Sequence, residues 1–172
     1  VVTCDAFSDI RMESFNTLYS KQYYLHNNAT GSVGINMESA WKIAPDLGQD
    51  ITVAVIDEGV EHNHEDLPNV LDGFTANITS GKGDPMGSIN AHGTACAGII
   101  SGANNSIGIR GIASNVKIIP VNICTSWNSA TNKYEYVTEE SIADAIIWAS
   151  ERADVLSCSW GYAKGTEKAI IT

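Results

Sequence analysis

The sequence predicts an α/β fold in which helices flank a parallel β-sheet. Three short apolar segments rich in β-branched residues alternate with segments of helical pattern along the 172 residues. Strands that alternate with helices of this length are joined by crossover connections, which make neighbouring strands parallel. Because the apolar segments lack the alternation of a one-sided strand, we expect a sheet that is covered on both faces.

The expected strands and helices follow one another in order. Strands are predicted over 51–56, 116–121 and 155–159, all three buried, with a polar surface loop over 125–136. Helical segments are predicted over 37–43 and 92–101. A third helix begins after Thr138, a favourable N-cap residue that is followed by an acidic first turn. Its apolar residues recur at the spacing of an amphipathic helix: Ile142, Ala145, Ile146 and Ala149.

The two ends of the chain differ from the middle. Residues 1–20 are weakly patterned and are expected to form an N-terminal arm, whereas residues 21–172 form part of one domain. Residues 165–172 look like the first turns of a helix that leads into a further strand. A parallel sheet that stopped there would keep unpaired backbone groups along one edge. We therefore expect an α/β domain that is incomplete at its C-terminus.

The composition of the chain disfavours some classes of binding partner. The formal net charge is −10 and the sequence pI is about 4.6, which argues against nucleic acid or an anionic membrane as a partner. No apolar run approaches the roughly 20 residues of a membrane-spanning helix. The four scattered cysteines match no zinc or redox spacing. We expect mainly buried thiols, with one disulfide as the alternative.

Two polar residues stand where parallel sheets place functional side chains. Asp57 directly follows the first expected strand, and side chains beyond the carboxyl ends of strands gather at one edge. His92 begins the second expected helix. Histidine exchanges a proton near neutral pH, and an aspartate orients it by accepting its hydrogen bond. Taken singly, each residue has a purely structural interpretation. Asp57 would be a polar residue that ends a strand, and His92 would be a structural or surface histidine.

Together the two residues lie in motifs that resemble the N-terminal signatures of the subtilase family. The motifs are 53–60, VAVIDEGV, and 92–98, HGTACAG, and they occur in the family's order, aspartate before histidine. The resemblance implies a subtilisin-like fold and a secreted or extracytoplasmic serine endopeptidase that hydrolyses peptide bonds. It leans toward the kexin-like and bacterial secreted branches.

The resemblance implies that Asp57 orients His92 and that His92 activates a serine. The family's serine lies in a later Gly-Thr-Ser motif, which does not occur in these 172 residues. We expect it in a second chain or a C-terminal half, with a peptide or protein as substrate, and we expect residues 1–172 alone to be inactive. The alternative is a catalytically inactive half-domain, or pseudopeptidase, that binds extended peptides.

Cys96 raises a further alternative, because it lies one helical turn after His92 and a cysteine–histidine pair is a known type of nucleophile. A thiol at that place on the helix is expected to face the core. Apolar neighbours raise the pKa of such a thiol and make it inert.

The resemblance also implies substrate-binding residues. Ser159, Trp160 and Gly161 match the segment that pairs with an extended substrate through backbone hydrogen bonds. Glu58 follows the aspartate, where an acidic residue favours basic substrate side chains in the kexin-like branch; a solvated carboxylate is an equal alternative. Residues 162–164, YAK, depart from the acidic stretch of that branch, so dibasic specificity is not predicted.

A calcium site is the remaining implication. Residues 103–109 resemble the family's calcium loop, and calcium takes six to eight oxygen ligands. A glutamine near the N-terminus often completes the family's site, which makes Gln22 a weak candidate here. The alternative is an Asn-rich turn closed by side-chain hydrogen bonds. The implied ligands are the side chains of Asp66 and Asn105 and the carbonyls of Ala103, Ile107 and Ile109.

Overall fold

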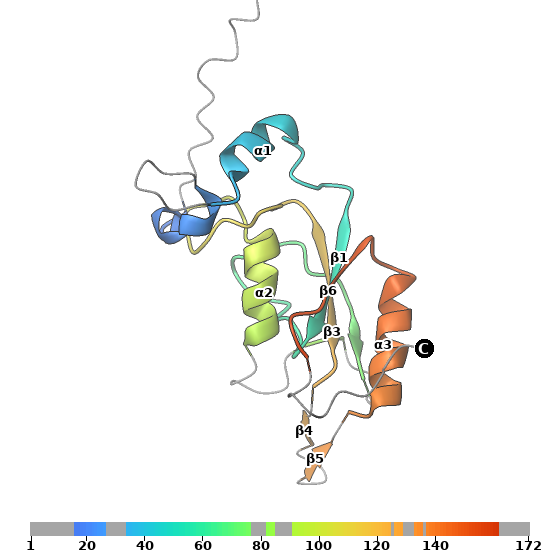
Figure 1. Cartoon of the computed structure of the whole chain (residues 1–172). Coiled ribbons are helices and arrows are strands. Elements are labelled where there is room, and N and C mark those ends of the chain that lie inside the picture. Colours follow the sequence, from blue (N-terminus) through green and yellow to red (C-terminus); the bar gives the residue numbers. More distant parts are fainter. Residues whose placement is uncertain are drawn as a thin grey trace, which may run out of the picture.

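A four-stranded parallel sheet forms the centre of the chain, and two helices, α2 and α3, lie on its opposite faces (Figure 1). The computed structural model describes residues 16–26, 34–76, 82–84, 91–124, 126–128, 133–135 and 137–161. The strands are ordered β2-β3-β1-β6, and β4 and β5 form a separate antiparallel pair. The strands are β1 Thr52–Asp57, β2 Phe74–Thr75, β3 Lys117–Asn122, β4 Ser126–Asn128, β5 Lys133–Glu135 and β6 Val155–Ser157. The helices are α1 Met37–Ile43, α2 His92–Ser101 and α3 Glu139–Ser150, preceded by the 3₁₀ turns η1 Tyr19–Lys21 and η2 Tyr23–Leu25.

β1 is an inner strand of the sheet and pairs in parallel on both sides. β3 accompanies its whole length, from Thr52 opposite Lys117 to Asp57 opposite Asn122. β6 pairs along the other side. Residues 53–57 are all buried, as the unbroken apolar run predicts.

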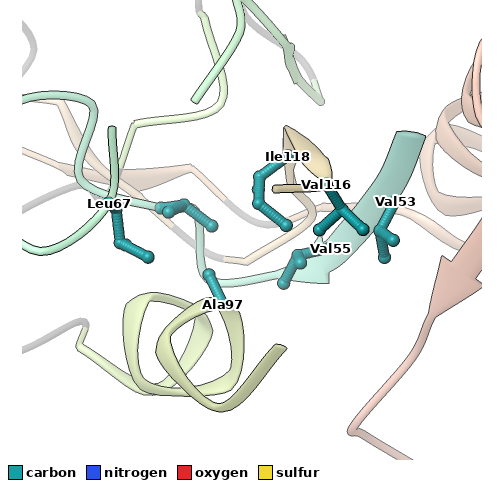
Figure 2. Packing of buried hydrophobic residues seen from close by; sticks show 7 residues of the cluster. Val53, Val55, Leu67, Ala97, Val116 and Ile118 are labelled. Atoms are coloured by element: carbon teal, nitrogen blue, oxygen red, sulfur yellow. The ribbon is translucent and has the colours of Figure 1, made fainter. Parts of the chain in front are cut away.

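Two apolar clusters join the sheet to its helices. Successive side chains of β1 point to opposite faces, so residues 53 and 55 serve one cluster and residues 54 and 56 the other. On the α2 face, Ala97 of the helix shares a cluster with Val53 and Val55 of β1, Ile118 of β3, and Val60, Leu67 and Val116 outside the strands (Figure 2). On the α3 face, the cluster consists of Ala54, Ile56, Ile119, Val121, Ile123, Ala145 and Ala149.

The third helix begins as the sequence predicts. The Thr138 hydroxyl accepts a hydrogen bond from the backbone N–H of Ser141 at 3.1 Å, which satisfies one of the free donors of the first turn. The buried residues Ala145 and Ala149 lie on the face that covers the sheet. The predicted cap and the predicted apolar stripe are therefore both confirmed.

Two expectations about strands are wrong. β6 is an edge strand rather than a buried one: Val155 is 50% exposed, and no described strand pairs along its outer side. Residues 125–136 are not simply a loop, because β4 and β5 form a short ladder within them. Residues 1–15 of the expected arm and the expected helix at 165–172 lie outside the described residues. No helix in the described part of the chain is long and apolar enough to cross a membrane.

Candidate functional site

Asp57 ends the inner strand β1, and its side chain is 3% exposed. Its Oδ1 atom accepts a hydrogen bond from the backbone N–H of Glu58 at 2.8 Å. Its carbonyl oxygen accepts another from the N–H of Ile123, directly after β3. The carboxylate is thus fixed at the carboxyl-end edge of the sheet.

His92 opens α2 and lies against this carboxylate. Its Nδ1 atom is 2.9 Å from Oδ1 and 3.0 Å from Oδ2 of Asp57, while the imidazole itself is 56% exposed. An ionised carboxylate only accepts hydrogen bonds, so Nδ1 carries the proton and Nε2 of the neutral ring is left as an acceptor. A buried acid therefore orients an exposed base.

The pair also shifts the titration of the imidazole. The hydrogen bond that His92 donates to Asp57 raises the pKa of His92 above its ordinary value of 6.5, and the negative charges of Asp57 and Glu58 add to the effect. Desolvation of the ring opposes the shift but is the smaller influence on the pKa. The arrangement favours the imidazolium ion, which is the charge that a general base acquires when it takes a proton.

Gly93 makes this contact possible. A Cβ atom on Gly93 would collide with the carbonyl oxygen of Gly59 and lie 3.0 Å from Cβ of Asp57. Gly59 itself has φ +96°, a backbone conformation that side chains disfavour. The two glycines together let the first turn of α2 approach the turn that follows β1.

The expected substrate-binding residues lie at the same edge of the sheet. Glu58 is half-buried beside the pair, and Ser159 and Gly161 are exposed after β6. The indole N–H of Trp160 donates a hydrogen bond to the carbonyl of Ile56 at 2.8 Å, which ties this segment to β1. The structure brings all four residues to the end of β1.

The thiols of this region differ in position. Cys96, Cys124 and Cys158 are free; the first two are half-buried and Cys158 is exposed, so the expectation of mainly buried thiols is wrong for the cysteines that the structure describes. Burial raises the pKa of Cys124 to about 11, with the charges of Glu58 and Asp57 contributing. Burial and Asp57 also raise the pKa of Cys158. Both stay protonated at neutral pH and are poor nucleophiles.

Cys96 lies beneath the imidazole. Its Sγ atom is 3.9 Å from Nδ1 of His92, the nitrogen that Asp57 already engages, and it packs against the apolar cluster under α2. A general base would need to offer Nε2 to the thiol, so this placement does not suit a cysteine–histidine nucleophile.

A second candidate site surrounds the loop after α2. The carboxylate of Asp66 accepts hydrogen bonds from Nδ2 of Asn105 at 2.9 Å and from the backbone N–H of Ile109 at 3.2 Å. The backbone N–H of Ala103 donates to the carbonyl of Asp66 at 3.0 Å. The five residues expected as calcium ligands therefore belong to one compact loop cluster.

Asn16 lies at the centre of this cluster. Its Nδ2 atom is within 3.1 Å of four oxygens: Ala103 O, Asn105 Oδ1, Ile107 O and Ile109 O. An amide nitrogen carries two hydrogens and cannot satisfy four acceptors, whereas an oxygen-seeking cation is suited by all of them. A half-turn of the amide would replace Nδ2 by Oδ1, which is itself a suitable ligand. The residues present fit a calcium ion.

Sequence reasoning missed Asn16 and pointed to Gln22 instead. The Gln22 amide bonds to the backbone of Arg110 in both directions, at 2.9 Å and 2.8 Å. Residues 16–20, expected as part of a separate arm, are held to the loop, since the N–H of Leu18 also donates to the carbonyl of Gly108. No local pattern marks Asn16, because the oxygens around its side-chain amide belong to residues 87 or more positions away.

The two glycines of α2 give a matched test of this geometry. We expect Gly93→Ala to lower the free energy of unfolding by about 1–3 kcal/mol, because the added methyl group overpacks the contact with Gly59 and Asp57. Gly98→Ala places its methyl group 3.4 Å from Ile109 Cδ1, a tolerable distance, and should be neutral or stabilise by up to about 1 kcal/mol. Urea unfolding of both variants checks this, and equal effects would contradict the packing described.

Comparison with known proteins agrees with the site. Residues 48–170 match the model of the subtilase family. A calcium-dependent protease from a Nostoc species is 32% identical over 161 residues, 86% of this chain and 22% of that protein. Human proprotein convertase subtilisin/kexin type 6 is 32% identical over 165 residues, 90% of this chain and 16% of that protein.

Solved structures show the same fold. The serine protease of Aeromonas sobria superposes with a TM-score of 0.69 at 29% identity, over 88% of this chain and 26% of that one. Fervidolysin from Fervidobacterium pennivorans gives a TM-score of 0.57 at 31% identity, over 74% of this chain and 20% of that one. The chain spans about a quarter or less of the length of these relatives. Because the family model covers most of its residues and the parallel sheet with flanking helices agrees, the chain belongs to the subtilase family.

Proposed function

We propose that this chain supplies the aspartate and histidine of a subtilisin-type serine endopeptidase, and that a serine outside residues 1–172 completes the triad. The observation that carries the proposal is the buried Asp57 carboxylate bonded to Nδ1 of the exposed His92. That bond leaves Nε2 as an acceptor on the solvent side. A base held in this way is what a serine hydroxyl needs in order to become a nucleophile.

In the proposed reaction, Nε2 of His92 removes the proton of the serine hydroxyl as the serine oxygen bonds to the scissile carbonyl carbon. The resulting imidazolium is stabilised by Asp57, which remains ionised. His92 then gives the proton to the leaving amine as the carbon–nitrogen bond breaks. Water repeats the sequence and releases the acyl group, which returns the serine and the imidazole to their starting states.

The segment after β6 supports binding of an extended peptide, which pairs through backbone hydrogen bonds. Ser159 and Gly161 are exposed in it, and Trp160 fixes the segment to β1. Glu58 lies next to the pair, either as a contact for basic substrate side chains or as a solvated carboxylate. A pseudopeptidase would bind extended peptides at the same segment.

Fluorophosphonate labelling of the complete product of the gene that encodes residues 1–172 tests the proposal. We expect an adduct on a serine outside this segment, identified by peptide mass spectrometry. His92→Ala should slow labelling at least about a thousandfold, because the members of a triad act as a unit. His26→Gln is the matched control, since His26 contacts Glu38 and Tyr19 instead of Asp57, and should label normally.

Two outcomes would count against a peptidase. One is a wild-type protein with no labelled serine that still binds extended peptides, which is the behaviour of a pseudopeptidase. The other is labelling that His92→Ala leaves unchanged.

We further propose that the Asp66 cluster binds a structural calcium ion. The support is the convergence of four oxygens on the position of Asn16 Nδ2, with the Asp66 carboxylate beside them. One relative carries calcium dependence in its name. The ion would join residues 16–18 to the loop after α2. Such a role suits a secreted or extracytoplasmic protein, where free calcium is high enough to fill weaker sites.

The calcium proposal predicts a metal-dependent stability. The unfolding temperature of the chain should rise with added calcium, since an ion that binds the folded state stabilises it by about 2.7 kcal/mol at a hundredfold excess over Kd. Asp66→Asn should raise the Kd for calcium at least about tenfold by removing the anionic ligand. Asp144→Asn, which removes the same charge from the exposed face of α3, is the control. An unfolding temperature that ignores calcium, or an Asp66→Asn variant that responds like wild type, would refute the site.

A further inference from the structure

Asn122 is a buried polar residue that the proposed reaction does not use. It ends β3, lies opposite Asp57 in the parallel register and is 0% exposed. A buried amide costs free energy unless its donor and its acceptor both find partners. The partners of this amide therefore indicate what the residue does.

The amide of Asn122 joins two segments of the chain. Its Oδ1 atom accepts a hydrogen bond from the backbone N–H of Cys124 at 2.9 Å, which closes a local turn after β3. Its Nδ2 atom donates to the backbone carbonyl of Asp84 at 2.8 Å. A carboxylate could not donate the second bond and an ammonium group could not accept the first, so an amide is suited to this position.

The carbonyl that Asn122 holds lies against the turn after β1, residues 57–60. A Cβ atom on Gly59 would lie 2.6 Å from this carbonyl oxygen and 2.5 Å from the carbonyl oxygen of Gly83. The backbone N–H of Val60 donates a hydrogen bond to the same Gly83 carbonyl at 2.9 Å. Residues 83–84 therefore pack directly against the turn with their main-chain atoms.

On its other side the turn bonds to the residue that follows β3. The backbone N–H of Ile123 donates to the carbonyl of Asp57 at 2.9 Å. The turn also contacts α2, because a Cβ atom on Gly93 would collide with the Gly59 carbonyl and lie 3.0 Å from Cβ of Asp57. A displacement of the turn would thus move Asp57 relative to the first turn of α2, which carries His92.

We propose that Asn122 is a positioning residue whose buried amide holds the turn 57–60 between β3 and residues 83–84, and thereby sets the geometry of the Asp57–His92 hydrogen bond. It acts through the backbone of the turn and not on the imidazole itself. Hydrogen bonds weaken steeply as their distance and angle depart from the optimum, so a small shift of the turn is enough. The catalytic consequence rests on the proposed function, whereas the geometry of the pair does not.

Two variants separate the two hydrogen bonds of the amide. Asn122→Leu has a similar volume and removes both. Asn122→Ser keeps a hydroxyl that can close the local turn to Cys124, but it is too short to reach the Asp84 carbonyl. Because the link to Asp84 is the one that holds the turn 57–60, we expect both variants to disturb the Asp57–His92 pair.

NMR of the chain with isotope-labelled histidine reports on this pair. In both variants the pKa of His92 should fall toward 6.5, and the downfield proton resonance of its Nδ1–H should weaken, because the contact with Asp57 is lost. In the complete gene product, fluorophosphonate labelling should slow roughly ten- to hundredfold, as expected for a small misplacement of a catalytic group.

Two control variants lie elsewhere on or beside β3. Asn115→Leu removes an amide bond of the same kind, from Nδ2 to the carbonyl of Asp46 at 3.0 Å, before the other end of the strand. Ile119→Val lowers stability through the cluster on the α3 face. Both should keep the pKa of His92 and the Nδ1–H resonance of the wild type, and circular dichroism checks that each variant is folded.

Wild-type NMR values in folded Asn122→Leu or Asn122→Ser would overturn the proposal. Equal changes in Ile119→Val or Asn115→Leu would also overturn it, since a general loss of stability or of a surface bond would then account for the effect. The NMR measurements need no serine. They therefore decide the role of Asn122 even if the wild-type gene product fails to label, so this proposal and the proposed peptidase function fail separately.

Discussion

The contact on which the rest of the site depends is the close approach of α2 to the turn after β1. It allows Nδ1 of His92 to reach a carboxylate that is almost wholly buried. The approach requires bare backbone at Gly59 and Gly93, since a side-chain carbon on Gly93 would meet the Gly59 carbonyl and Asp57 itself. The acid, Asp57, is held in place by burial, and the base, His92, is exposed to solvent. The hydrogen bond between them joins the rigid part of the site to the reactive part.

The same two elements organise the second cluster. α2 carries His92 at its first residue, ends at Ser101 and leads directly into the loop that surrounds Asn16. The chain after β1 runs from Asp57 to Asp66, whose carboxylate holds that loop. A helix of this length is about 15 Å long, and the two clusters lie near its opposite ends. An ion at the loop would therefore fix the far end of the helix that positions the base.

The sequence predicted the parts of this arrangement that leave local patterns. The run at 51–56, the small-residue helix beginning at His92 and the Thr138 cap each depend on neighbouring residues, and each was found in place. Asp57 and His92 could be singled out because strand ends and helix starts are visible in the pattern. The exposure of β6 depends on the segments that pair beside it, and the residues of β6 alone do not indicate these.

The contacts that escaped prediction are long-range. Asn16 is one polar residue in a weakly patterned segment, and its importance comes from oxygens 87 to 93 residues away. Gln22 was the more conspicuous amide, yet its geometry matches the backbone of Arg110. The thiol of Cys96 was expected to face the core and packs against the apolar cluster under α2, but its distance from Nδ1 of His92 emerged only from the structure.

The coupling of His92 to Asp57 is tested most directly by the pH titration of His92 by NMR, in the presence of a metal chelator. We expect a pKa above 6.5, because the hydrogen bond to Asp57 and the charge of that residue stabilise the imidazolium. In Asp57→Asn, which keeps the shape and removes the charge, the pKa of His92 should fall toward its ordinary value. A wild-type pKa at or below 6.5, or one that Asp57→Asn leaves unchanged, would show that the two residues are not coupled as described.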